Sequence, residues 1–184
     1  MIKRGEIVLG GRTRALPNAL VAHLHVFRGA HAAKVGAYVA APGRFPGAPS
    51  DMVSQWGLAV GDTTQIPNSA GVDLWLIPGT SGDCLEWEIP SEGPGNGGAG
   101  CSPTSRVLAG NFYAFIGLAY GGTMVIGVAP DTNTHVTAGA MSGATQTAPV
   151  SDNVYVLRSP GTINSVTVAD ASGTVATRPV PAQP

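Results

Sequence analysis

Two apolar segments joined by a pair of glycines constrain the fold of this chain more than any other feature. The runs FYAFIGLAY (112–120) and TMVIGVA (123–129) are separated only by Gly121 and Gly122. Glycine adopts positive φ without steric cost, so this pair suits the tight turn of a β-hairpin. Both runs are nearly continuous in apolar residues, which is typical of strands that are buried on both faces. The pattern therefore predicts a hairpin that is covered on either side.

Further short apolar runs lie on both sides of this hairpin, with turn residues between them. They predict strands at 72–77, 84–89, 135–140, 145–150, 153–158, 163–170 and 174–178. The chain has 26 glycines and 15 prolines, but 43% of its residues are hydrophobic, which is not the composition of a disordered protein. Short strands at this interval indicate an antiparallel sandwich or barrel. We predict an all-β fold, an antiparallel β-sandwich or partly open barrel with a short N-terminal helical arm.

The N-terminal part of the chain has a different pattern. Leucines near helical spacing after a proline predict a helix over 17–28, and the segment 39–51 is rich in proline and glycine. We therefore divide the chain into a basic helical arm with a Pro/Gly-rich linker (1–49), a β domain (50–178) and a disordered tail (179–184).

Two short helices are expected within the β domain. Ser50 and Asp51 can cap a helix that reaches Trp56, and Ser102 can cap a second helix that ends at Gly110. Hydroxyl and carboxylate side chains favour these positions because they accept hydrogen bonds from the free N–H groups of the first turn.

The charge is divided unevenly between the two ends of the chain. Residues 1–44 carry seven basic and one acidic residue, a net charge of +6, and residues 45–184 carry three basic and ten acidic residues, a net charge of −7. Such an arm docks on its own acidic domain or binds an anionic surface. The basic residues are scattered, so no nucleic-acid partner is predicted. No export signal is recognisable, and no apolar run approaches the ~20 residues of a transmembrane helix.

The two cysteines, Cys84 and Cys101, permit three interpretations. A zinc site needs about four ligands in close pairs, and His135, the nearest histidine, has no such spacing, so no metal is predicted. Cys101 precedes the helix cap Ser102, where a thiolate would be favoured, and a histidine beside it would make a hydrolase. The interpretation that we favour is a disulfide, because the glycine-rich stretch between the cysteines lets them meet. Such a bond stabilises by about 3 kcal/mol and indicates an oxidising compartment.

A pair of carboxylates offers a second catalytic candidate. In the strand 84–89 the alternation places Glu86 and Glu88 on the face of Cys84, with their carboxylates ~6–7 Å apart, near the range of glycosidase pairs. The same spacing is also typical of the solvated face of a strand, which is the interpretation that we favour.

Histidines and tryptophans complete the candidate side chains. The histidines are interpreted as solvated or helix-capping residues, and the tryptophans as part of the core or its rim. They are His23, His25, His31, Trp56, Trp75 and Trp87.

Four stretches carry a resemblance over about residues 72–170. They are DLWLIPGTSGDCLEWE, GCSPTSRVLAG, VIGVAPDTNTHVTA and APVSDNVYVL. This pattern resembles uncharacterised envelope or secreted β-domain proteins of high-GC bacteria. The resemblance implies an extracytoplasmic location but no activity or binding residues. The V-x-P-D motif at 128–131 and the D-N-V-Y motif at 152–155 are interpreted as turns that set strand register.

These observations predict a non-enzymatic, extracytoplasmic structural or binding module, stabilised by the Cys84–Cys101 disulfide. Its partner would be a cell-envelope component or another protein, and no cofactor is expected. The alternatives are a hydrolase that uses Cys101 or the Glu86/Glu88 pair, and a module whose basic arm binds an anionic surface.

Overall fold

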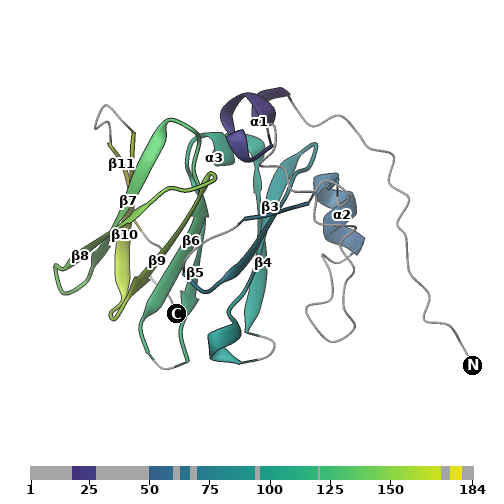
Figure 1. Ribbon diagram of the computed structural model, residues 1–184. Coiled ribbons are helices and arrows are strands. Elements are labelled where there is room, and N and C mark those ends of the chain that lie inside the picture. Colours follow the sequence, from purple (N-terminus) through teal and green to yellow (C-terminus); the bar gives the residue numbers. More distant parts are fainter. Residues whose placement is uncertain are drawn as a thin grey trace, which may run out of the picture.

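Three antiparallel sheets stack face to face in the described part of the chain, with short helices at one end and on one outer face (Figure 1). The computed structural model describes residues 18–27, 50–59, 63–66, 70–93, 96–119, 121–170 and 175–179. The predicted all-β antiparallel fold is confirmed, and the sheets are not closed into a barrel.

The first sheet is formed by consecutive strands, whereas the central and third sheets are each completed by strands that come after intervening strands of the other. The first sheet has the order β1 (Thr64–Gln65), β2 (Asp73–Ile77), β3 (Gly82–Glu88), β4 (Gly97–Pro103). The central sheet has the order β5 (Phe112–Gly117), β6 (Thr123–Val128), β9 (Val154–Ser159). The third sheet has the order β11 (Val175–Pro179), β10 (Ile163–Asp170), β7 (Asn133–Ala140), β8 (Thr145–Pro149). The helical segments are α1 (Asn18–His23), η1 (His25–Phe27), α2 (Ser50–Trp56), η4 (Pro90–Glu92) and α3 (Thr104–Leu108).

The middle strand of the central sheet, β6, is buried on both faces, as its continuous apolar run predicts, whereas β5 is mostly half-buried. All six residues of β6 are buried. Met124 and Ile126 belong to the core shared with the first sheet, whereas Val125 belongs to the core shared with the third sheet. Because side chains alternate along a strand, successive residues of a strand between two cores face different cores, which favours apolar residues along its whole length.

The glycine turn of the central hairpin is confirmed. Gly121 and Gly122 have φ of 93° and 92°, in the region that glycine occupies readily. A Cβ atom on Gly122 would also lie 2.5 Å from the carbonyl oxygen of Ser159, so this position has no room for a side chain.

The glycine-rich stretch before Cys101 is a strand, β4, and not the loop that its composition suggests. Gly98 lies directly opposite Trp87 of β3, and a Cβ on Gly98 would lie 2.5 Å from the Trp87 ring. The absent side chain makes room for the indole, which compensates for the low strand preference of glycine. Trp87 is buried, and Trp56 and Trp75 are half-buried, which are the core and rim positions predicted.

The helices agree only partly with the predictions. The helix α2 begins at Ser50 and ends at Trp56 as expected. The predicted helix 17–28 is instead α1 followed by the 3₁₀ turn η1. The Ser102 cap is wrong, because Ser102 lies in β4 opposite Asp83, and Pro103 precedes α3 without a side-chain cap. Pairing with β3 keeps Ser102 extended.

Several predictions fall on residues that the structure does not describe. They are the remainder of the arm and linker (1–17 and 28–49) and the end of the tail (180–184). The strand β11 extends to Pro179, the first residue of the predicted tail, on the edge of its sheet where proline is tolerated. Within the described ranges, no helix has the length and hydropathy that crossing a membrane requires.

Candidate functional site

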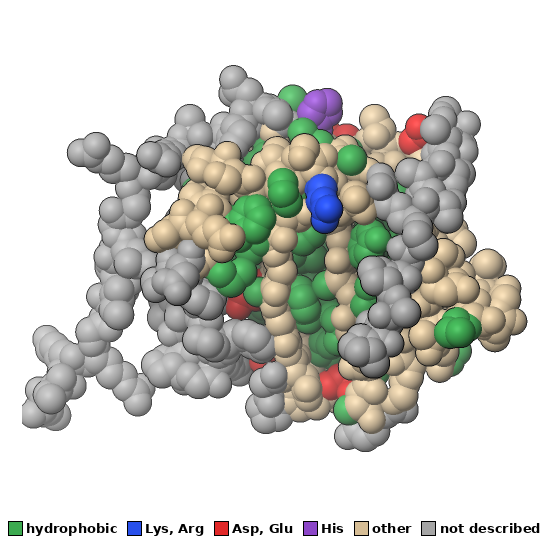
Figure 2. Space-filling view, turned by 180° about the vertical axis from the view of Figure 1, so that it is seen from behind, with side chains coloured by type: hydrophobic (Ala, Val, Ile, Leu, Met, Phe, Trp, Pro, Cys, Tyr) green, Lys and Arg blue, Asp and Glu red, His purple; other side chains and the backbone are tan. Residues whose placement is uncertain are grey.

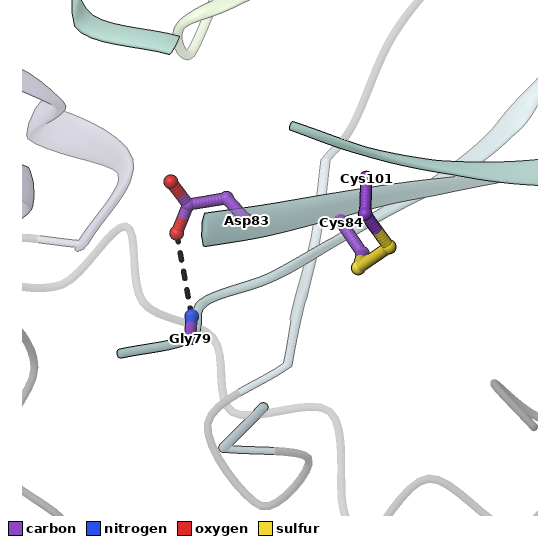
Figure 3. The surroundings of a disulfide bond; sticks show 4 residues. All are labelled: Gly79, Asp83, Cys84 and Cys101. Carbon is purple, nitrogen blue, oxygen red and sulfur yellow. Dashed lines mark hydrogen bonds between the residues drawn. A yellow bond between two sulfur atoms is a disulfide. The ribbon is translucent and has the colours of Figure 1, made fainter. Parts of the chain in front are cut away.

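The disulfide joins two strands that are hydrogen-bonded neighbours. Cys84 of β3 and Cys101 of β4 are directly opposite in the register and form the predicted bond, with Cα atoms 4.0 Å apart (Figure 3). Both cysteines of the chain are thus used. The hydrolase hypothesis based on Cys101 is wrong, because its sulfur is bonded to Cys84 and is no free nucleophile.

A small apolar cluster covers the disulfide on the outer face of the first sheet. Met52, Val53 and Trp56 of α2 pack against a cluster of Leu58, Ile77 and Cys84, and Cys101 packs against the same cluster from β4. A helix of seven residues is too short to be stable alone, so this apolar contact holds α2 in place.

Beside the disulfide lies a buried acid, Asp83, which the sequence reasoning missed. Its side chain is 0% exposed, and Figure 3 shows its carboxyl group directed toward Gly79 and away from the disulfide. Oδ1 accepts a hydrogen bond of 3.3 Å from the backbone N–H of Gly79. The other oxygen, Oδ2, and the buried hydroxyl of Thr104 make no hydrogen bond.

Burial raises the pKa of Asp83 from 3.8 to about 7. The hydrogen bond from Gly79 and the nearby Thr104 hydroxyl lower the pKa by smaller amounts, although the hydroxyl does not reach hydrogen-bond geometry. A carboxyl group with this pKa is largely protonated below pH 7, so the buried side chain carries little charge in that range.

The predicted alternation of β3 is confirmed, but the solvated face is not. Leu85 and Trp87 lie in the core between the first and central sheets, whereas Cys84 faces α2. Glu86, on the face of Cys84, is only 6% exposed, and Glu88 is half-buried. A glycosidase pair must present both carboxyl groups to a sugar, so the burial of Glu86 disfavours the catalytic interpretation.

A second polar site lies at the end of the sandwich, where α1 and η1 meet two turns of the β domain. His25 contacts Asp131 twice, since its backbone N–H and its ring Nδ1 each lie 2.8 Å from Asp131 Oδ1. The other ring nitrogen, Nε2, lies 3.4 Å from Asp152 Oδ1. The interpretation of His25 as merely solvated or capping is therefore wrong, because it connects the N-terminal segment to two aspartates.

Asn153 completes this site. Its Oδ1 accepts a hydrogen bond of 2.9 Å from the N–H of Val26, and its Nδ2 donates to the carbonyl of Ala129 and to Asp131 Oδ1, at 3.0 and 2.8 Å. Asp152 and Asn153 have φ of 48° and 63°, a conformation that these two residue types tolerate better than most. We call Asp131, Asp152 and Asn153 the clasp. The V-x-P-D and D-N-V-Y motifs thus do more than set register, because they bind the N-terminal segment.

The segment held by the clasp, residues 18–27, is named here the N-terminal plug. Its apolar side chains Leu20, Leu24, Val26 and Phe27 are buried in the core between the first and central sheets. Burying each such side chain stabilises the fold by about 2 kcal/mol. The plug is therefore part of the core, and the clasp adds directional bonds to that apolar contact.

The remaining candidate residues do not join either site. His23 and His135 are exposed, and His31 lies outside the described residues, as do all seven basic residues of segment 1–44. In the part of the chain that is described, no three His, Cys, Asp or Glu side chains are arranged to hold a metal ion.

Comparison with known proteins adds no assignment to this geometry. No family model, curated protein or solved structure matches the chain significantly.

Proposed function

We propose that this protein is a non-enzymatic binding or structural module that acts outside the cytoplasm. The observation that carries this proposal is the Cys84–Cys101 disulfide, which uses both cysteines of the chain. Disulfides form and persist in oxidising compartments and are rare in the reducing cytosol. The resemblance to envelope and secreted β-domain proteins supports the same location.

The molecular surface supports a binding role. On the rear face, hydrophobic side chains are visible between strand backbones in the described part of the molecule (Figure 2). Hydrophobic side chains that gather on one exposed face are typical of surfaces that bind other molecules. The partner that we propose is a cell-envelope component or another protein.

The compartment is tested by the thiol state of the protein in its native cells. The cells are fractionated, each fraction is alkylated without reductant, and the intact mass of the protein is measured. A second sample, which is reduced before alkylation, is the control. We expect no added label in the first sample, two labels in the second, and the protein outside the cytoplasmic fraction. Two labels without reduction would contradict both the disulfide and the compartment.

The absence of catalysis is tested separately with the remaining carboxylate candidates. The purified protein is assayed with glycoside, ester and peptide substrates, alongside Glu86→Gln and the matched variant Glu88→Gln. We expect the same background hydrolysis in all three proteins. Turnover by the native protein that is lost in Glu86→Gln, while that variant stays folded, would establish an enzyme instead.

A further inference from the structure

The N-terminal plug is bound by the β domain as a separate segment would be. Its contacts combine buried apolar side chains with hydrogen bonds from the clasp, which lies more than 100 residues away in sequence. The backbone N–H groups of His25 and Val26 are both bonded to clasp side chains, at 2.8 and 2.9 Å. Recognition of backbone and side chains together is how proteins bind short peptides.

The connection from the plug to the rest of the chain is long. Residues 28–49, 22 residues in all, separate Phe27 from the start of α2 at Ser50. Fully extended, this length of chain spans up to about 75 Å. A compact domain of this size has a radius of gyration of about 16 Å, so the plug of one molecule can reach the clasp of another.

The charges also favour such an encounter. The plug sits within segment 1–44, which carries a net charge of +6, whereas residues 45–184 carry −7. The clasp itself contributes two carboxylates, Asp131 and Asp152. Opposite charge therefore attracts the arm of one copy to the β domain of another. The same electrostatic attraction favours docking of the arm on the β domain of its own chain.

We propose that the clasp is an intermolecular docking site, and that residues 18–27 of a second copy of this chain can occupy it in exchange for the chain's own plug. Each copy then donates its plug and accepts that of a partner, so the contacts of the single molecule are kept in a closed dimer. This inference rests on the proposed binding role and names its partner. Its test measures self-association, whereas the thiol and turnover tests concern compartment and catalysis, so each can fail separately.

The experiment uses two full-length variants with one new cysteine each, His25→Cys in the plug and Asp131→Cys in the clasp. The native side chains face each other at 2.8 Å, so the new thiols meet only when a plug occupies a clasp. The variants are mixed, unfolded in urea with the native disulfide intact, refolded together and oxidised, and the cross-link is mapped by peptide mass spectrometry. The double variant in one chain is the control for cross-linking geometry.

We expect a covalent heterodimer joined through positions 25 and 131. Its yield should increase with protein concentration toward about 1 mM, the effective concentration that a tether of moderate length provides. A synthetic peptide of residues 18–27 should reduce the yield at least about tenfold when in large excess, and the same peptide with Leu24→Asp should not, because Leu24 is fully buried.

Two results would overturn the proposal. One is a mixture that stays monomeric up to that concentration while the double variant cross-links within its own chain. The other is a double variant that does not cross-link at all although it is folded by fluorescence, since the plug would then not occupy the clasp. The substitutions could themselves prevent the dimer from forming. The unmodified protein is therefore refolded at the same concentrations and its oligomeric state is measured by native mass spectrometry. A monomer there as well would equally contradict exchange.

Discussion

Replacing Asp83 with asparagine isolates the effect of a buried ionisable group on the stability of this fold. The amide has the shape of the neutral acid but cannot ionise. Its Oδ1 can still accept the hydrogen bond from the Gly79 N–H. The variant therefore keeps the packing of the protonated side chain at every pH.

The magnitude follows from the pKa of Asp83, which burial raises from 3.8 to about 7. Below pH ~4 the carboxyl is protonated in both the folded and the unfolded chain, and stability is at its full value. Between pH 4 and 7 the unfolded chain loses this proton while the folded protein retains it, so the free energy of unfolding decreases as the pH rises. Each unit of pKa difference corresponds to ~1.4 kcal/mol, so the decrease is at most about 4 kcal/mol and is complete above pH 7.

The assay is urea unfolding at constant ionic strength from pH 4 to 8, followed by tryptophan fluorescence with the disulfide intact. We expect Asp83→Asn to match the native protein at pH 4 and to be more stable than it at pH 8. The difference between the two proteins reports Asp83 alone, because all other titrating groups are shared. Asp73→Asn, a substitution of a half-buried aspartate on β2, is the matched control and should keep the native decrease.

One result would refute this reasoning. If the difference between the native protein and Asp83→Asn is the same at pH 4 and pH 8, Asp83 does not titrate differently in the folded and unfolded chains. Its burial would then carry no electrostatic cost, for instance because the carboxylate is solvated in solution.

Three further experiments test other parts of the structure. Reducing the Cys84–Cys101 disulfide should lower the free energy of unfolding by about 3 kcal/mol, and reductant should leave the Cys84→Ala/Cys101→Ala double variant unchanged in urea titrations. Gly98→Ala should destabilise by about 1–3 kcal/mol because its Cβ meets the tryptophan ring opposite, whereas Gly161→Ala, with nothing within 4 Å of a Cβ, should be close to neutral in the same assay. Asn153→Gly keeps the positive φ but removes the side-chain bonds to the plug, so amide exchange at positions 25 and 26 should become faster while the strands stay protected.

The extent to which the sequence predicts this protein differs between local and long-range features. The central hairpin, with its glycine turn, and the helix that begins at Ser50 are local, and both were predictable from a few neighbouring residues. The strand β4 was not, because glycine disfavours strands, and both its pairing with β3 and the room that Gly98 leaves for the Trp87 ring are tertiary features. The Ser102 cap failed for the same reason, since pairing with β3 overrides the local preference for a helix cap.

The candidate sites show the same division. The disulfide was predictable because only two cysteines exist and their connection is short. The clasp was not, because His25 and Asp131 are 106 residues apart and nothing in either segment reveals the other. Its three residues belong to two motifs that the sequence identifies as turns. Aspartate and asparagine are common both in turns and at sites that bind another segment, so the residue types alone do not distinguish the two roles.

By itself, the sequence determined the class of fold, the positions of most strands and the pair of cysteines that bond. These depend on the alternation of apolar residues, on turn-forming residues and on composition, all of which act over a few positions of the chain. Only the tertiary structure decided which strands pair within each sheet, that Asp83 and Glu86 are buried, and that the plug is held by the clasp. Burial and long-range hydrogen bonds depend on which segments pack together, and packing joins residues that are far apart in the chain.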